Sequence, residues 1–153
     1  MKRAGGERLR WGAAALGWVV ASAVGVVVSP VFRFLYGLAA QPPVERGEFT
    51  ATVVAISLVS GFIAYLLGGY VAGKVAGVAG GLNGAMTAVF GLIAGLVLAS
   101  VLAVFGVLFS EGVAMPPAGF GLAGAALLAG LALFLVNLMG GYVGGKLGEP
   151  IRL

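Results

Sequence analysis

The sequence predicts an all-α fold, a polytopic membrane protein whose four transmembrane helices form a compact bundle. Hydrophobic residues make up 61% of the 153 residues and charged residues only 9%, whereas a soluble domain carries about 25% charged residues. Four apolar runs are long enough to cross the ~30 Å hydrocarbon core as helices, and none of them contains an internal charge. Water does not keep so apolar a surface dispersed, so we expect the lipid bilayer to cover it.

The four runs are predicted to form a single membrane domain over residues 1–153. Backbone N–H and C=O groups find no water in hydrocarbon, so each run should be a helix. Prolines and charges separate the runs in QPPVERGE (residues 41–48) and in SEGVAMPPAG (residues 110–119). The predicted helices cover residues 11–29, 49–71, 82–109 and 118–143.

The first apolar run continues beyond Pro30 to residue 40 and includes Arg33. A straight helix from Trp11 to Ala40 would be about 45 Å long at ~1.5 Å per residue, which exceeds the hydrocarbon thickness. We therefore expect a kink or break at Pro30, followed by an interfacial segment over residues 30–40 in which Arg33 reaches lipid phosphates. A re-entrant or gating loop and a simple extension of the helix are the alternatives.

The distribution of basic residues predicts the orientation, because cytoplasmic loops carry an excess of Lys and Arg. With a cytoplasmic N-terminus, seven basic residues lie inside and two lie outside. We therefore expect a multi-pass protein of the inner (cytoplasmic) membrane with both termini in the cytoplasm. The seven are Lys2, Arg3, Arg8, Arg10, Lys74, Lys146 and Arg152, and the two are Arg33 and Arg46.

A twelve-residue stretch occurs twice, as LLGGYVAGKVAG at residues 66–77 and as LMGGYVGGKLGE at residues 138–149. Both copies contain G-x-x-x-x-G-K, the beginning of a phosphate-binding loop. The residue that follows the lysine is Val75 or Leu147 instead of Ser or Thr. Each copy also lies at the C-terminal end of an apolar run, where the helix dipole disfavours anions. The sequence therefore predicts no nucleotide site.

The repeat is instead typical of close helix packing, since small residues four apart let another backbone approach. Its tyrosines and lysines are predicted interfacial anchors, as is Arg33. The offset of the two copies also predicts two helical hairpins in parallel orientation. The predicted packing residues are Gly68, Gly69, Gly73, Gly140, Gly141 and Gly145, and the predicted anchors in the repeat are Tyr70, Lys74, Tyr142 and Lys146.

Residues 66–98 resemble the middle of an uncharacterised family of small bacterial four-helix integral membrane proteins. That family carries a G-G-Y-x-A-G-K-x-A-G motif, a short link and an L-x-G that opens the third helix. The resemblance covers about a third of the chain and implies a four-span fold, with no catalytic residues to carry over. The matching residues are Gly68, Gly69, Tyr70, Ala72, Gly73, Lys74, Ala76, Gly77, Leu82 and Gly84.

The residues that most enzymes and metal sites require are scarce. The chain has no Cys and no His, and its five acidic residues are all Glu and lie outside the apolar runs. We therefore expect no catalytic site, no cofactor and no metal site, and no binding of nucleic acid. Asn137 of the fourth run aligns with Tyr65 of the second, and with Ser60 these residues form a candidate polar cluster.

Asn83 is predicted to cap the third helix. Thr87 is expected to form a small polar cluster with Asn83 at that end of the helix.

These features favour a structural or assembly component, present as a homo-oligomer or as a subunit of a membrane complex. The alternative is a passive transporter or channel subunit for a small neutral or lipid-like solute. A transporter should have a polar cavity around Asn137, Tyr65 and Ser60, whereas a scaffold should be dry and fully packed there.

Overall fold

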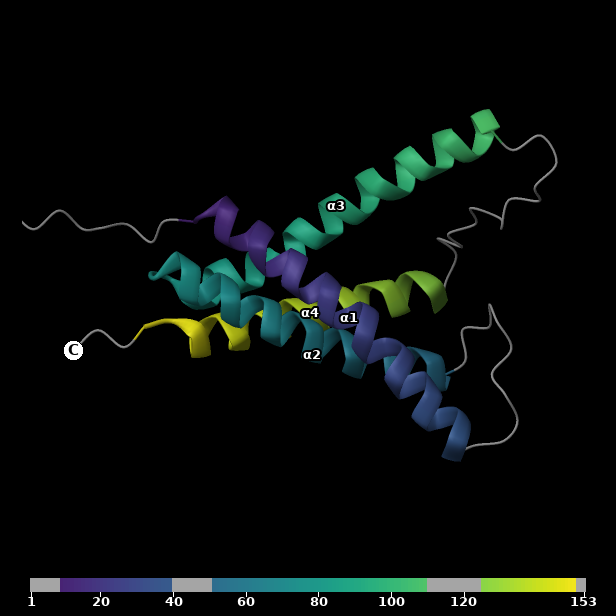
Figure 1. Cartoon of the computed structure of the whole chain (residues 1–153), viewed down its shortest axis with the longest axis horizontal. Coiled ribbons are helices and arrows are strands. Elements are labelled where there is room, and N and C mark those ends of the chain that lie inside the picture. Colours follow the sequence, from purple (N-terminus) through teal and green to yellow (C-terminus); the bar gives the residue numbers. More distant parts are fainter. Residues whose placement is uncertain (1–8, 40–50, 110–124, 151–153) are drawn as a thin grey trace, which may run out of the picture.

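The computed structural model describes residues 9–39, 51–109 and 125–150. These residues form four helices joined in a bundle (Figure 1). Each helix contains a stretch that is long and apolar enough to cross a membrane. The all-α, four-helix membrane fold predicted from the sequence is therefore confirmed. The helices are α1 (Trp11–Ala39), α2 (Ala51–Ala76), α3 (Gly80–Phe109) and α4 (Ala125–Gly148).

The starts of α1 and α3 lie at the same end of the bundle as the ends of α2 and α4. We call this the lysine end, because Lys74 and Lys146 lie in the last turns of α2 and α4. Gly69 contacts Gly141 and Gly73 contacts Gly145, so α2 and α4 run in the same direction, as the two-hairpin prediction requires. The two hairpins are not fully equivalent, because α2 contacts α3 whereas α1 and α4 make no contact within the described residues.

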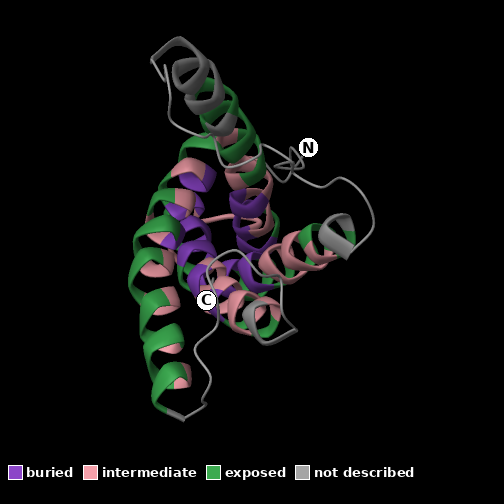
Figure 2. Ribbon diagram, turned by 90° about the vertical axis from the view of Figure 1, so that its right-hand side faces the viewer, coloured by how far each residue is buried: buried purple, intermediate pink, exposed green. Residues whose placement is uncertain are grey.

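The helices are tightly packed at the lysine end and diverge toward the opposite end. Figure 1 shows α3 leaving the other helices along its second half, and Figure 2 shows the buried residues gathered where the four helices meet. Beyond Gly91, α3 exposes Leu92, Leu96 and Val97, and a Cβ added to Gly95 would find no atom within 4 Å. The second half of α3 therefore presents an apolar surface to its surroundings, as expected for a lipid-embedded helix.

The structure corrects the prediction for residues 30–40. Helix α1 continues through Pro30 without interruption, so the expected break is not present and residues 30–39 extend the helix, which was the stated alternative. Residue 40 lies outside the described residues. A proline removes one backbone hydrogen bond, here to the carbonyl of Val26, whereas ending the helix in lipid would leave several carbonyls unpaired. At 29 residues, α1 is about 44 Å long by its ~1.5 Å rise per residue, and a bilayer accommodates such a helix by tilt or protrusion.

The other helix boundaries also differ from the prediction near the lysine end. Helix α2 extends to Ala76 and α4 to Gly148, so both repeats lie within helices up to and beyond their lysines. Gly77 ends α2 in the left-handed conformation (φ 67°), and its N–H donates to the carbonyl of Gly73 at 3.1 Å. Helix α3 then begins at Gly80. The part of the fourth predicted helix over residues 118–124 lies outside the described residues.

Candidate functional site

The repeated glycines bring α2 and α4 into direct backbone contact. A Cβ added to Gly69 would overlap the carbonyl oxygen of Gly141 and lie 2.7 Å from its Cα atom. A Cβ added to Gly73 would meet the carbonyl of Gly145 in the same way, 2.8 Å from its Cα atom. Only glycine lets two helices approach this closely, so the two copies of the repeat face each other in register.

A second row of glycines on α4 extends this contact. Cβ atoms added to Gly140, Gly144 and Gly148 would meet the carbonyls of Phe62, Leu66 and Tyr70 on α2. Gly144 and Gly148 were not among the predicted packing residues, although their spacing of four from Gly140 is visible in the sequence. Glycines of α3 complete the arrangement, because a Cβ on Gly84 or Gly80 would overlap the carbonyls of Gly141 and Gly145 respectively.

Gly68 faces a different helix from its neighbour Gly69. A Cβ on Gly68 would overlap the carbonyl of Gly17 and lie 2.8 Å from the Cβ atom of Ala21, both on α1. Gly17 in turn lies against Gly68, Thr87 and Ala72. The adjacent glycines of the first repeat therefore serve two interfaces, one with α1 and one with α4.

The predicted anchors are exposed and share one geometry in both repeats. The Lys74 ammonium group lies 5.9 Å from the centre of the Tyr70 ring, and that of Lys146 lies 5.9 Å from the centre of the Tyr142 ring. This distance is within the range of a cation–π contact. Arg33 is exposed on α1. The interfacial role of these side chains stays a prediction.

Asn83 caps α1, and the prediction that it caps the third helix is wrong. It is the fourth residue of α3 and has no exposed surface. Its side-chain oxygen accepts a hydrogen bond from the N–H of Arg10 at 2.8 Å, and its amide group donates to the carbonyls of Val78 and Ala79 at 3.1 and 3.2 Å. Thr87 lies in the same polar cluster, because its hydroxyl donates a hydrogen bond to the backbone carbonyl of Asn83 at 3.4 Å.

The N-terminus of α3 is capped by Glu149, a residue for which the sequence suggested no role. The N–H of Gly80 donates to Glu149 Oε2 at 3.0 Å. A carboxylate at this position also complements the partial positive charge of the helix N-terminus. Both caps come from residues about 70 positions away, so spacing along the sequence could not have found them.

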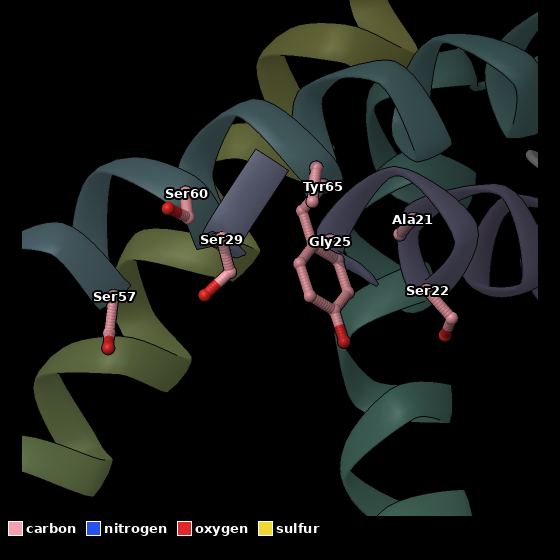
Figure 3. A pocket seen from close by; sticks show the side chains of 9 residues that line it. Ala21, Ser22, Gly25, Ser29, Ser57, Ser60 and Tyr65 are labelled. Atoms are coloured by element: carbon pink, nitrogen blue, oxygen red, sulfur yellow. The ribbon is translucent and has the colours of Figure 1, made fainter. Parts of the chain in front are cut away.

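A cleft of about 260 Å³ lies between α1 and α2, from about the middle of α2 toward the end opposite the lysine end. Five of the lining residues carry a hydroxyl group (Figure 3), although most of the lining surface is apolar, and none of the described residues that line it is charged. The remaining lining residues are small, which leaves the space open. The cleft is lined by Ser22, Ser29, Ser57, Ser60 and Tyr65 together with Ala21, Gly25, Gly61 and Ala64.

Ser60 is notable because its hydroxyl oxygen is buried and has no hydrogen-bond partner. Serines in membrane helices usually bond to the carbonyl four residues earlier, and Ser100 on α3 does so with Leu96 at 2.8 Å. Ser60 is only 4% exposed, so solvent outside the cleft does not satisfy it either. An unpaired buried hydroxyl is costly, and its oxygen is closed off from the cleft as well as from the outer surface.

The predicted cluster of Asn137, Tyr65 and Ser60 is only partly assembled. Ser60 and Tyr65 line the cleft, whereas Asn137 does not. The side-chain oxygen of Asn137 lies against Gly61 of α2 and is buried without a hydrogen-bond partner. The expected interhelical hydrogen bond is therefore not formed by that oxygen.

The cleft is closed toward the lysine end. A Cβ added to Gly91 of α3 would meet the Tyr65 hydroxyl and lie 2.8 Å from Cδ1 of Trp18. Trp18 also packs on Phe90 with ring centres 5.6 Å apart. Together with the contact between Gly17 and Gly68, these side chains block the route from the cleft to the lysine end.

Within residues 9–39, 51–109 and 125–150, no group of three or more His, Cys, Asp or Glu residues could hold a metal ion. Comparisons with family models, with curated proteins and with solved structures found no match.

Proposed function

We propose that this integral membrane protein is a structural or assembly component, acting as a homo-oligomer or as a subunit of a larger membrane complex. The observation that carries the proposal is the backbone contact among α2, α3 and α4, centred on Gly141 and Gly145. Close backbone contact through small residues is typical of stable helix association in membranes. Such a core suits a rigid element better than a moving one.

The cleft favours a second candidate, a passive transporter or channel subunit for a small neutral or lipid-like solute. It meets only part of the sequence-based criterion of a polar cavity around Asn137, Tyr65 and Ser60, because Ser60 and Tyr65 line it and Asn137 does not. It ends, however, at Tyr65, Trp18 and Gly91. A solute could cross only if α1 or α3 moved away from the others at this point, so we rank this candidate second.

The assembly role is tested by the mass of the protein in its native membrane. The protein is extracted directly into polymer nanodiscs, and the mass of the released protein is measured by native mass spectrometry. We expect a stable species larger than the 15.2 kDa chain, made of several copies or of this chain with a stoichiometric partner. A 15.2 kDa monomer at every concentration would contradict the proposal.

Transport is tested in parallel by stopped-flow light scattering on proteoliposomes, with erythritol as the probe solute. We expect the rate of uptake to equal that of protein-free vesicles. Saturable uptake that is lost in Ser57→Phe, which fills the cleft, would instead support the transporter. Ser100→Phe is the matched control, because Ser100 is an exposed residue of α3 that does not line the cleft.

A further inference from the structure

The cleft between α1 and α2 is narrow and lies along the two helices. On α1 its lining runs from Ala21 to Ser29, which is about 12 Å at ~1.5 Å per residue, and its volume is about 260 Å³. A helix of another chain is ~10 Å wide and would need several times this volume over the same length. The cleft therefore has room for one extended chain and not for a helix.

The body of the cleft suits an alkyl chain. Most of its lining surface is apolar, and the Ser60 oxygen is closed off from an occupant. The exposed side chains beside the cleft, such as Val26 and Val59, are apolar as well. A hydrocarbon chain from the bilayer therefore finds van der Waals partners on both helices. The small residues that leave room for it are Ala21, Gly25, Gly61 and Ala64.

Polar groups lie at one end of the cleft. Ser29 of α1 and Ser57 of α2 are the lining residues farthest from the lysine end, and both side chains point to the same side of the helices (Figure 3). Arg33 is exposed and follows Ser29 by four residues, so it lies one helical turn farther out on the same face of α1. These three residues form the mouth of the cleft, and its single charge is positive.

The length of α1 places Arg33 at the headgroups of one leaflet. From Arg10, directly before α1, to Arg33 the helix rises about 35 Å at ~1.5 Å per residue. The hydrocarbon core is ~30 Å thick, so the two arginines reach the headgroups of opposite leaflets. The cleft extends from Arg33 toward the middle of the membrane, which is the direction that the chains of a lipid take when its phosphate lies at Arg33.

The charge at the mouth decides which lipid fits. The Arg33 guanidinium pairs with a phosphate, and the hydroxyls of Ser29 and Ser57 donate to phosphate or ester oxygens. Within the described part of the chain the only acidic residue is Glu149, at the lysine end, so no carboxylate there pairs with the cation of a zwitterionic headgroup. We propose that the cleft binds one anionic phospholipid of the phosphatidylglycerol type, with its phosphate at Arg33 and one acyl chain between α1 and α2.

Tryptophan fluorescence tests the position of the acyl chain, because Trp18 lies beside Tyr65 at the closed end of the cleft. The protein has two tryptophans, and Trp11→Phe leaves Trp18 as the only one. This variant is reconstituted into phosphatidylcholine vesicles that contain either phosphatidylglycerol or phosphatidylcholine with the same acyl chains, brominated near their ends. Bromine quenches tryptophan at short range. We expect the phosphatidylglycerol to quench Trp18 at least twofold more than the phosphatidylcholine at equal mole fraction.

Variants of Arg33 and Ser57 connect this quenching to the headgroup and to the cleft. In the Trp11→Phe background, Arg33→Gln should weaken the apparent affinity for phosphatidylglycerol about fivefold, the effect of one basic residue near anionic lipid, whereas Arg33→Lys should retain most of the preference. Ser57→Phe fills the cleft and should remove the preferential quenching. Ser100→Phe is its control and should change nothing, since Ser100 does not line the cleft. Far-UV circular dichroism verifies that each variant retains its helices.

Three outcomes would overturn the proposal. Equal quenching by the two brominated lipids would mean that the cleft does not select an anionic headgroup. A preference that survives Arg33→Gln would mean that the phosphate does not lie at Arg33, and one that survives Ser57→Phe would mean that the lipid gathers at Arg33 without entering the cleft. None of these results changes the mass of the assembly in nanodiscs, so the failure of this inference is distinct from that of the assembly role.

Discussion

At the scale of single residues, the glycines of this protein differ sharply in what an added Cβ would meet. At Gly69 and Gly73 it would collide with the backbone of α4, whereas at Gly95 and Gly130 it would find no atom within 4 Å. All four lie in helices of similar composition. Their importance for packing therefore depends on the neighbouring helix and not on the residue type.

This contrast gives the first prediction. Gly69→Ala should destabilise the protein by about 1–3 kcal/mol or more, because the new methyl group overlaps the backbone of Gly141, which has no side chain that could move aside. Gly95→Ala, the matched control, should be neutral or slightly stabilising, since alanine has the higher helix propensity. Unfolding by SDS, followed by far-UV circular dichroism, measures both. Equal stability of the two variants would refute the packing role.

The second prediction concerns Asn83. Asn83→Ala leaves the N–H of Arg10 and the carbonyl of Val78 without their side-chain partner, whereas the carbonyl of Ala79 still accepts from the backbone N–H of residue 83. A buried unpaired group costs about 1–3 kcal/mol. Thr87→Val is a milder change of similar volume, because it removes a single 3.4 Å bond within α3. In the same SDS titration, Asn83→Ala should lose clearly more stability than Thr87→Val. A similar loss for both would mean that Asn83 does not connect α1 to α3.

At the scale of helices, the ends near the lysine end are stabilised by residues from other helices. Asn83 of α3 caps α1, and Glu149, directly after α4, caps α3. Helix ends leave backbone groups unpaired, and near a membrane these groups need partners from the protein when water is excluded. Each cap therefore forms only when two segments that are distant in the sequence pack together, so the helix ends are stabilised by the assembly of the bundle.

The third prediction tests the cap of α3. Glu149→Ala should destabilise the protein by about 0.5–2 kcal/mol, the usual effect of losing a helix cap. Glu149→Gln keeps an oxygen acceptor for the N–H of Gly80 but loses the charge that favours a helix N-terminus, so it should fall between wild type and Glu149→Ala. The midpoint of SDS unfolding gives this order. If Glu149→Gln were no more stable than Glu149→Ala, the hydrogen bond would not matter.

At the scale of the whole molecule, the two ends of the bundle are built differently. The lysine end is held by contacts between backbones, whereas at the opposite end α3 diverges and the cleft opens between α1 and α2. Small residues dominate the first region and hydroxyl groups line the cleft in the second. One bundle thus combines a half held by backbone contacts with a half in which the helices diverge and a cleft opens.

The fourth prediction concerns orientation. The chain contains no cysteine, so single cysteines label without background. We expect Lys74→Cys and Lys146→Cys to react with a membrane-impermeant maleimide only after the cells are permeabilised, and Arg33→Cys to react in intact cells, because basic residues favour the cytoplasmic side. The unmodified protein is the control. Labelling of Lys74→Cys and Lys146→Cys from opposite sides would contradict the four-span topology.

Composition and the lengths of the apolar runs were sufficient to predict four membrane helices, because hydrocarbon requires every backbone group to be paired within its own helix. The duplicated glycines also indicated where helices approach closely. The same reasoning failed at Pro30, where continuing the helix leaves fewer backbone groups unpaired than ending it. The caps formed by Asn83 and Glu149, the division of Gly68 and Gly69 between two neighbours, and the cleft at Ser60 all depend on how distant segments are placed against one another. Such placement is a property of the packed bundle, since no local spacing along the chain encodes which helix a given face will meet.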